Sequence, residues 1–447
     1  MSRKTFHLAS LGCAKNSVDT DSMAQLLEQD GYQLVRSPQQ ASVLIVNTCG
    51  FIAPAREESI AELRALAAVK RPDQILIAAG CLTQRYGTDV ASQVPGVDGI
   101  LGTRRWMDIV EVVRELRKSR HTEPLYHLPE SPTIGTDEGS TLRATQTGAS
   151  AYLKIADGCR RPCAFCAIPL IKGTAVSRPM DAILADALRL QELGVRELNL
   201  IAQDTTDYGH DLGMKDGLAK LLEGLVAAVP NLDWIRILYA YPGYVTERLI
   251  EVMASHPQIL PYLDIPLQHA HPDVLWRMSR PANMAWVYQT IAKMRAALPG
   301  LAIRTTFIVG YPGESEAEFQ TLLDFVAEMR FDRLGAFQFS FEPGTSSESL
   351  GDPIPPEVKE ERYQRLMLLQ QGISLQANQS FVGKKLDVLI EARDKYKKLY
   401  LGRSYRDAPE IDGWVFVEGR TEIGQIVPVR ITGAMTYDLS GVVDAPA

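Results

Sequence analysis

Short apolar runs alternate with amphipathic stretches along most of this 447-residue chain. In its first part, the runs at 6–12, 43–48 and 75–80 have the continuous apolar character of strands that are buried on both faces of a parallel sheet. Stretches with helical spacing lie between the runs, and Pro54 suits the first turn of a helix. The pattern therefore predicts a small open α/β sheet that ends with a helix over 106–120.

The alternation resumes on a larger scale after a break. Half of the 32 residues from 119 to 150 are Ser, Thr, Pro or Gly, which is typical of a linker or an irregular crossing segment. Beyond it, helical stretches separate six strand candidates, and this predicts a parallel barrel or part of one. The six candidates are 151–156, 197–202, 234–240, 262–267, 303–310 and 334–340.

The last part of the chain changes character once more. After a helix predicted over 356–378, short β-rich runs are separated by Gly, Asp and Pro, as in a small antiparallel barrel. The sequence therefore predicts an α/β protein with three domains. Their expected bounds are 4–118, 145–382 and 383–447.

Composition restricts the class of protein. The chain is 46% hydrophobic and carries a net charge of −7, which suits a globular protein and argues weakly against one that mainly grips phosphate backbones. No apolar run approaches the 18 residues of a membrane span, and the N-terminus lacks the pattern of an export signal. Six cysteines are too few for a disulfide scaffold of this size, so we expect a cytoplasmic protein without membrane contact.

Three of the cysteines stand close together, and we call them the loop triad: Cys159, Cys163 and Cys166. Their spacing is C-x₃-C-x₂-C, directly after the first strand of the predicted barrel. Three thiolates in so short a loop can hold one iron–sulfur cluster and leave one iron open, because a four-iron cluster takes four ligands. A zinc site or three buried free thiols are the alternatives. No histidine lies near the loop to complete a closed zinc site.

The other cysteines are far apart in the sequence, and we call them the strand-end triad: Cys13, Cys49 and Cys81. Each follows an apolar run directly. Because the carboxyl ends of parallel strands lie along one edge of a sheet, we expect the three thiols to converge and to be able to hold a second cluster. The alternative is that buried apolar strands simply collect cysteine.

Motifs over nearly the whole chain resemble the radical S-adenosylmethionine methylthiotransferases, a family that attaches methylthio groups to unactivated carbons. Three spread cysteines, a C-x₃-C-x₂-C barrel and a β-domain of the TRAM type follow one another in the same order. Short sequence motifs also agree with the family: SLGCAKNSVD (10–19), NTCGF (47–51), AGCLTQRY (79–86), LDIPLQHA (263–270) and FIVGYPGE (307–314).

The resemblance implies two 4Fe-4S clusters and S-adenosylmethionine as cofactors. The loop triad would hold the cluster that binds S-adenosylmethionine, and the strand-end triad would hold an auxiliary cluster that carries the sulfur to be transferred. No catalytic residue beyond the cluster ligands is implied. A one-electron donor such as a flavodoxin or a ferredoxin is the expected redox partner.

Further contacts with S-adenosylmethionine are expected from the superfamily and from the strand ends of the barrel. Phe165 corresponds to a position that commonly lies by the adenine in enzymes of this kind. Ligands bind at the ends of barrel strands, which nominates Gln203, Asp204, Arg304 and Gly310. A satisfied strand-end hydrogen bond for the polar residues, and a simple turn for the glycine, are the alternatives.

Two branches of the family differ in substrate. One modifies an adenosine beside the tRNA anticodon, and the other modifies the β-carbon of an aspartate in a small-subunit ribosomal protein near the decoding centre. Residues 399–447 carry four arginines against seven carboxylates, and an acidic module suits a basic ribosomal protein better than tRNA. The sequences of 402–417, 201–209 and 173–179 also resemble the ribosomal-protein branch. The basic stretch 391–400 favours the tRNA branch instead.

We therefore expect an aspartate methylthiotransferase that acts on the ribosomal protein or on the assembling subunit. A tRNA adenosine methylthiotransferase is the alternative within the same enzyme class. An iron–sulfur electron carrier is the alternative from another class, and it would form no 5′-deoxyadenosine from S-adenosylmethionine and a reductant.

Overall fold

The computed structural model describes residues 4–118, 122–129, 141–394, 396 and 399–444, and these divide into two compact units. The first unit comprises 1–145, 152–186 and 342–348, and the second comprises 146–151, 187–341 and 349–447. Within the described residues, no helix is long and apolar enough to cross a membrane.

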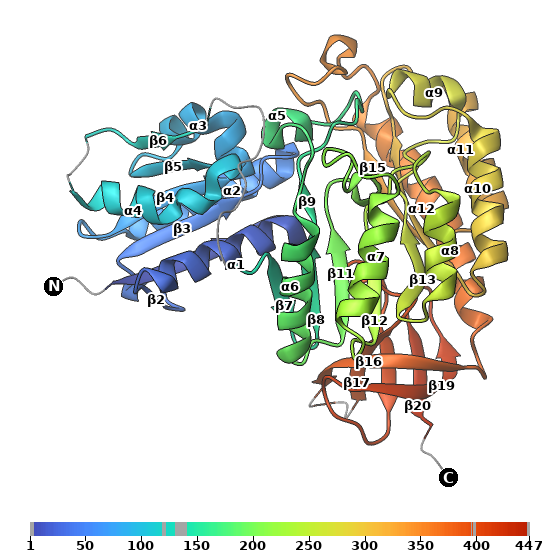
Figure 1. Ribbon diagram of the computed structural model, residues 1–447. Helices are drawn as coiled ribbons and strands as arrows, with labels where there is room; N and C mark the ends of the chain where they lie inside the picture. The colour runs from blue at the N-terminus through green and yellow to red at the C-terminus, as the bar shows by residue number, and fades with distance from the viewer. Residues whose placement is uncertain (1–3, 119–121, 130–140, 395, 397–398, 445–447) are drawn as a thin grey trace. The chain divides into compact units, whose positions relative to one another are not determined.

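The first unit contains the small α/β sheet that the sequence predicts, shown in blue and cyan in Figure 1. Its strand order is β2-β1-β3-β4-β5-β6, and the neighbouring strands run parallel. The strands are β1 (Thr5–Ser10), β2 (Gln33–Leu34), β3 (Val43–Thr48), β4 (Ile75–Gly80), β5 (Gly99–Gly102) and β6 (Leu125–His127). The helices between them are α1 (Ala14–Gln29), η1 (Pro38–Gln40), α2 (Ala53–Val69), α3 (Cys81–Gln93), η2 (Thr103–Asp108) and α4 (Ile109–Lys118).

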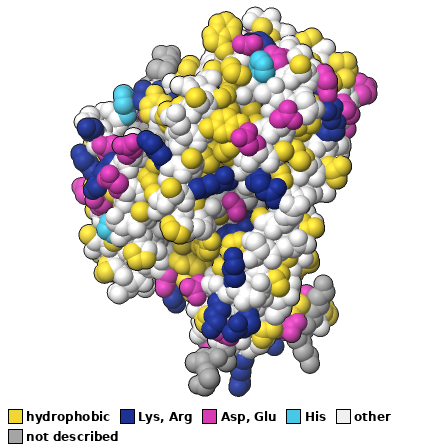
Figure 2. Space-filling model, turned by 90° about the vertical axis from the view of Figure 1, so that its right-hand side faces the viewer, with side chains coloured by type: hydrophobic (Ala, Val, Ile, Leu, Met, Phe, Trp, Pro, Cys, Tyr) yellow, Lys and Arg dark blue, Asp and Glu magenta, His cyan; other side chains and the backbone are white. Residues whose placement is uncertain are grey.

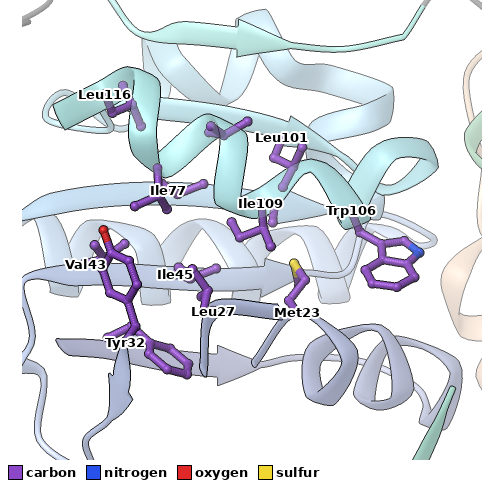
Figure 3. Packing of buried hydrophobic residues seen from close by; sticks show 14 residues of the cluster. Met23, Leu27, Tyr32, Val43, Ile45, Ile77, Leu101, Trp106, Ile109 and Leu116 are labelled. Carbon is purple, nitrogen blue, oxygen red and sulfur yellow. The ribbon is translucent and has the colours of Figure 1, made fainter. Parts of the chain in front are cut away.

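Alternate side chains of the central strands enter two separate cores. On β3, Val43 and Ile45 point into the core that α1 and α4 cover, where Figure 3 shows Val43 near Tyr32 and Ile45 near Leu27. Leu44 and Val46 of the same strand belong to the core under α2 and α3. Burial on both faces explains why the strands are continuous apolar runs rather than alternating ones.

Two details of this sheet differ from the expectation. The predicted helix over 106–120 begins as α4 only at Ile109, because the preceding residues form the 3₁₀ segment η2. The stretch expected to be a linker contributes β6, which pairs in parallel with β5. Its residues 130–140 lie outside the described part of the chain.

The six predicted barrel strands are all present, and together with a short edge strand they have the order β15-β14-β13-β12-β11-β8-β7. The strands are β7 (Ala144–Thr147), β8 (Ser150–Lys154), β11 (Glu197–Ile201), β12 (Trp234–Ile237), β13 (Ile259–Asp264), β14 (Ala302–Val309) and β15 (Arg333–Gln338). From β11 to β15, each pair of neighbours is parallel. This is the partial (β/α)₆ barrel expected from the sequence.

Helices follow the barrel strands along the chain. They are α6 (Met180–Glu192), η3 (Thr205–Asp207), α7 (Gly217–Ala228), α8 (Glu247–Ser255), α9 (Pro272–Arg277), α10 (Met284–Ala297), α11 (Glu316–Met329), η4 (Glu348–Leu350) and α12 (Pro356–Gln379). Aromatic rings help to join this layer to the sheet, since Phe307 of β14 packs edge to face against Phe325 of α11 at 6.4 Å between ring centroids.

A closed five-stranded barrel ends the chain and is drawn in red in Figure 1. Its strand order is β16-β17-β18-β20-β19, and in the described residues the pairings are antiparallel except between β18 and β20. The strands are β16 (Lys385–Asp394), β17 (Leu399–Ser404), β18 (Val415–Glu418), β19 (Ile426–Ala434) and β20 (Leu439–Val443). Closure leaves no open sheet edge.

A buried ionic triad joins the two barrels of the second unit. Glu197 of β11 accepts hydrogen bonds from Arg236 of β12 at 2.8 and 2.9 Å and from Arg403 of β17 at 2.5 Å. All three side chains are at most 1% exposed. Burial alone would raise the pKa of Glu197, but Arg403 and Arg236 lower it to about 2.

Replacing Glu197 by Gln would leave two buried guanidinium groups without their shared carboxylate. We expect Glu197→Gln to lower the free energy of unfolding by about 3–5 kcal/mol, measured by denaturant titration at neutral pH. Glu247→Gln is the matched control, because Glu247 forms an exposed ion pair with Lys293 and should change the same quantity by less than about 1 kcal/mol. Equal effects of the two substitutions would contradict this account.

The same carboxylate makes a pH prediction. Because the folded pKa of Glu197 lies below its ordinary value of 4.5, its contribution to stability is complete above pH 4.5 and declines as the pH falls toward about 2. The difference in unfolding free energy between the wild type and Glu197→Gln should therefore shrink over that range. A difference that stays constant down to pH 2 would contradict the assignment.

Candidate functional site

The carboxyl edge of the small sheet brings the strand-end triad together. Cys13 follows β1, Cys49 follows β3 and Cys81 follows β4, and these three strands are neighbours in the sheet. The chain changes direction of winding between β1 and β3, so that the triad sits at the topological switch point where open α/β sheets bind their ligands. The three cysteines therefore follow neighbouring strands at one edge of the sheet, and their role as ligands of one cluster stays a prediction.

Two glycines allow the close approach of these strand ends. A Cβ on Gly12 would lie 2.8 Å from Cβ of Cys49 and 3.1 Å from its Sγ. A Cβ on Gly50 would lie 2.5 Å from Cα of Leu82, the residue after Cys81. Each glycine therefore lets the backbone next to one cysteine pack directly against the segment that carries another.

Polar side chains hold these loops from within. Asn16 of α1 donates from Nδ2 to the carbonyl of Leu11 at 2.6 Å, and Asn47 of β3 donates to the carbonyl of Asn16 at 2.9 Å. Ser59 of α2 accepts a hydrogen bond from the backbone N–H of Cys49 at 3.0 Å. Our sequence reasoning missed these residues, although both asparagines stand in the motifs that carry the resemblance.

The environment of the three thiols suits a metal centre. Cys13, Cys49 and Cys81 are free thiols. Cys13 caps the N-terminus of α1 and Cys81 is the first residue of α3, and helix N-termini favour anionic ligands. Burial raises the pKa of Cys49, and it raises that of Cys81 to about 12. Because Cys49 and Cys81 are costly to ionise alone, this triad fits a cation-rich cluster, which would offset the negative charge of its thiolates.

The loop triad lies between β9 (Ala156–Asp157) and α5 (Ile168–Lys172), in the same compact unit as the strand-end triad. Backbone N–H groups donate to two of its sulfurs, from Arg161 to Cys159 and from Ile168 to Cys166, both at 3.4 Å. The strand before the loop, β9, pairs antiparallel with β10 (Val176–Ser177), which follows α5. Sulfurs that already accept backbone hydrogen bonds are suited to carry negative charge as metal ligands.

The residues nominated for S-adenosylmethionine have different surroundings. Phe165 lies in the cysteine loop and is half-buried, whereas the other four belong to the second unit. Gln203 follows β11, and its buried Oε1 has no hydrogen-bond partner in the described part of the chain, which leaves an acceptor for a ligand. Asp204 caps η3 by accepting a hydrogen bond from the backbone N–H of Thr206 at 3.0 Å.

The remaining two have protein partners. Arg304 lies near the start of β14 and forms ion pairs with Asp264 at 3.1 Å and Asp412 at 3.5 Å. Gly310 follows β14 with φ +71°, and a Cβ there would lie 2.5 Å from Cγ of Lys359. A turn and a close approach therefore account for the glycine, and a ligand contact for either residue stays a prediction.

Family models match three parts of the chain. Residues 5–102 match the uncharacterized protein family UPF0004, residues 153–326 match the radical SAM superfamily, and residues 382–443 match the TRAM domain. Among solved structures, the chain is similar to the radical S-adenosylmethionine methyltransferase TsrM from Kitasatospora setae, with a TM-score of 0.57 and 12% identity over 79% of this chain and 76% of that one. This likeness concerns the fold alone.

Fold and cysteine loop thus define a radical S-adenosylmethionine enzyme. Similar proteins identify the family within this superfamily. Proteins named ribosomal protein uS12 methylthiotransferase RimO are 50% identical in Chloroflexus aurantiacus (98% of this chain, 99% of the relative), 45% in Heliobacterium modesticaldum (98% and 95%) and 42% in Synechocystis (98% and 97%). The chain belongs to the RimO family.

The close approach at Gly50 can be tested without any cofactor. Gly50→Ala would force the Cys49 loop away from α3, and we expect a loss of about 1–3 kcal/mol in the unfolding free energy of the metal-free protein. Gly372→Ala is the control, because Gly372 lies in α12 with no atom within 4 Å of the added Cβ. It should be neutral or stabilise by up to about 1 kcal/mol. Similar values for both would contradict the steric argument.

Proposed function

We propose that this chain is a methylthiotransferase that adds a methylthio group to the β-carbon of an aspartate in ribosomal protein uS12. Its membership in the RimO family, with up to 50% identity over nearly the full length of both chains, carries the proposal. The presence of both cysteine triads in one compact unit supports it. The tRNA alternative has less support, because the relatives described above bear the ribosomal-protein name.

The proposed cofactors are two 4Fe-4S clusters and S-adenosylmethionine. The loop triad would hold the cluster that binds S-adenosylmethionine, and the strand-end triad would hold the other. When bound, these groups supply the electron, the radical chemistry at the substrate carbon, and the sulfur and methyl group that are transferred. Three thiolates per site leave one ligand position of each cluster for an exogenous group.

The residues of the chain itself would orient the cysteine ligands and bind S-adenosylmethionine. Backbone N–H groups orient the sulfurs of the loop triad, and Asn16 and Asn47 fix the loops that carry the strand-end triad. Of the nominated contacts with S-adenosylmethionine, Gln203 has the strongest support, because its buried Oε1 lacks a protein partner among the described residues. Phe165, Asp204, Arg304 and Gly310 remain nominated on the resemblance and on their strand-end positions.

Charge does not decide between the two substrate branches. Arg403 and Arg406 of the C-terminal barrel are buried, so that they contribute to the fold rather than to the surface. The whole stretch 383–447 carries ten basic and ten acidic residues, because the count from residue 399 left out residues 383–398, which hold six basic and three acidic residues. Figure 2 accordingly shows Lys and Arg side chains gathered at the lower end of the molecule, where the barrel lies. The assignment of the substrate therefore rests on membership in the RimO family and not on charge.

We propose further that the chain has three domains with the bounds 4–118, 145–382 and 383–447. The matches at 5–102, 153–326 and 382–443 support these divisions. The protein would act in the cytoplasm, together with its ribosomal substrate and a one-electron donor such as a flavodoxin or a ferredoxin.

The substrate is tested by mass spectrometry of uS12 from cells that lack this enzyme. We expect uS12 to lose its methylthio group, and a plasmid copy of the wild-type chain to restore it. Copies with Cys13→Ser or Cys159→Ser should not restore it, whereas Glu247→Gln, an exposed substitution, should. Retention of the group on uS12 together with loss of methylthio from a tRNA nucleoside would contradict the proposal.

The two-cluster assignment is tested by iron analysis after anaerobic reconstitution. We expect about eight irons per wild-type chain, and about four when the cysteines of either triad are replaced by Ser. About four irons in the wild type, lost entirely with one triad and unaffected by the other, would contradict a second cluster.

A further inference from the structure

A group of buried charges lies between the segments that carry the two triads. Lys172, the last residue of α5, donates to Asp19 of α1 at 3.0 Å and lies 3.4 Å from Asp157 of β9. Lys154 of β8 also pairs with Asp19, and it lies 3.1 Å from Asp157. Arg143 bonds to both carboxylates at 3.1 and 3.2 Å. The five side chains are at most 5% exposed.

The two carboxylates are anchored close to the cysteines. Asp157 stands two residues before Cys159, and Asp19 lies in the helix that begins after Cys13. Contacts between Asp19 and Lys172 therefore join elements 153 residues apart in the chain, one from each cysteine segment. Buried ions far apart in the sequence need a reason to be retained, since hydrophobic residues often replace such groups without loss of stability.

Lys172 differs from Lys154 in what else it faces. Its helix α5 packs against α3, which begins with Cys81. After burial, the positive charge of Lys172 is the strongest influence on the pKa of Cys81, and it acts to lower that pKa. Burial would lower the pKa of Lys172 itself, but Asp157 and Asp19 outweigh it, so that the ammonium stays charged. At Lys154 burial outweighs the two carboxylates and lowers the pKa.

We propose that Lys172 is a positioning residue for the metal centre of the strand-end triad, where its buried ammonium stabilises the more negative, reduced state of that centre. This inference rests on the proposed function, because it needs a redox-active centre at the strand-end triad. Asp19 and Asp157 fix the ammonium at the end of α5, the helix that packs against α3, which begins with Cys81. A fixed positive charge in a poorly solvated site favours the addition of an electron nearby, and a carboxylate at the same place disfavours it.

The test measures the reduction equilibrium of one centre at a time. In the full chain with the loop triad replaced by Ser, only the strand-end centre remains for an anaerobic redox titration followed by electron paramagnetic resonance. Lys172→Met should shift the ratio of reduced to oxidised centre at least tenfold toward the oxidised form, about 59 mV for a one-electron couple. Lys172→Arg, which keeps the charge, should restore the wild-type ratio within about threefold.

Two further variants separate this role from a purely structural one. Lys154→Met removes the same charge from the same group of ions, but from β8 rather than from the helix that packs against α3, and it should shift the ratio clearly less than Lys172→Met. Asp19→Asn should shift it in the opposite direction, and this variant keeps the inference testable if Lys172→Met does not fold. Equal shifts by both lysine variants, or no shift by any, would overturn the inference.

Failure of the proposed function gives a different result. If the chain that retains only the strand-end triad binds no iron, the two-cluster assignment is wrong, and the role of Lys172 falls with it. Iron bound at the expected content with an unchanged reduction equilibrium would overturn the role of Lys172 alone.

Discussion

The parallel pairing of β1, β3 and β4 is the constraint on which the candidate site depends. Parallel strands end at one edge of their sheet, and this places three cysteines together that are separated by more than thirty residues in the chain. Strand pairing alone brings these cysteines together, without any contact between them. Burial of the two cores on either side of β3 fixes the strand register, and the register fixes the thiols.

Sequence patterns predicted the parts of the structure that follow from local or periodic signals. The apolar runs predicted the strands, and the spacing of the loop triad predicted a compact ligand loop. The strand-end triad was predictable because each cysteine directly follows a run, so that strand-end geometry substitutes for sequence distance. Gly50 and Asn47 were within the recognised motifs, but only the packing shows that one permits a close approach and the other ties two loops together.

The buried charges were not predictable in the same way. Lys154 stands in an apolar strand, where alternation would place a lysine toward solvent, and its partner Asp19 is 135 residues away. The charge count over residues 399–447 was a poor guide to the substrate for a related reason. It treats every arginine as a surface group. Arg403 and Arg406 are buried among carboxylates of the fold, and this becomes visible only when tertiary structure pairs residues from distant strands.

The ionic contacts of the C-terminal barrel also bear on how this chain can be divided. Arg403 completes the pair of Glu197 and Arg236, Asp407 pairs with Arg333, and Asp412 accepts a hydrogen bond from Tyr262 at 2.7 Å. A chain that ended before β16 would leave Arg333 without Asp407 and Glu197 with only one of its two arginines. The TRAM match treats this segment as a separate domain, but its buried ion pairs tie it to the larger barrel. A chimera that exchanged it between enzymes would have to carry both halves of each ion pair.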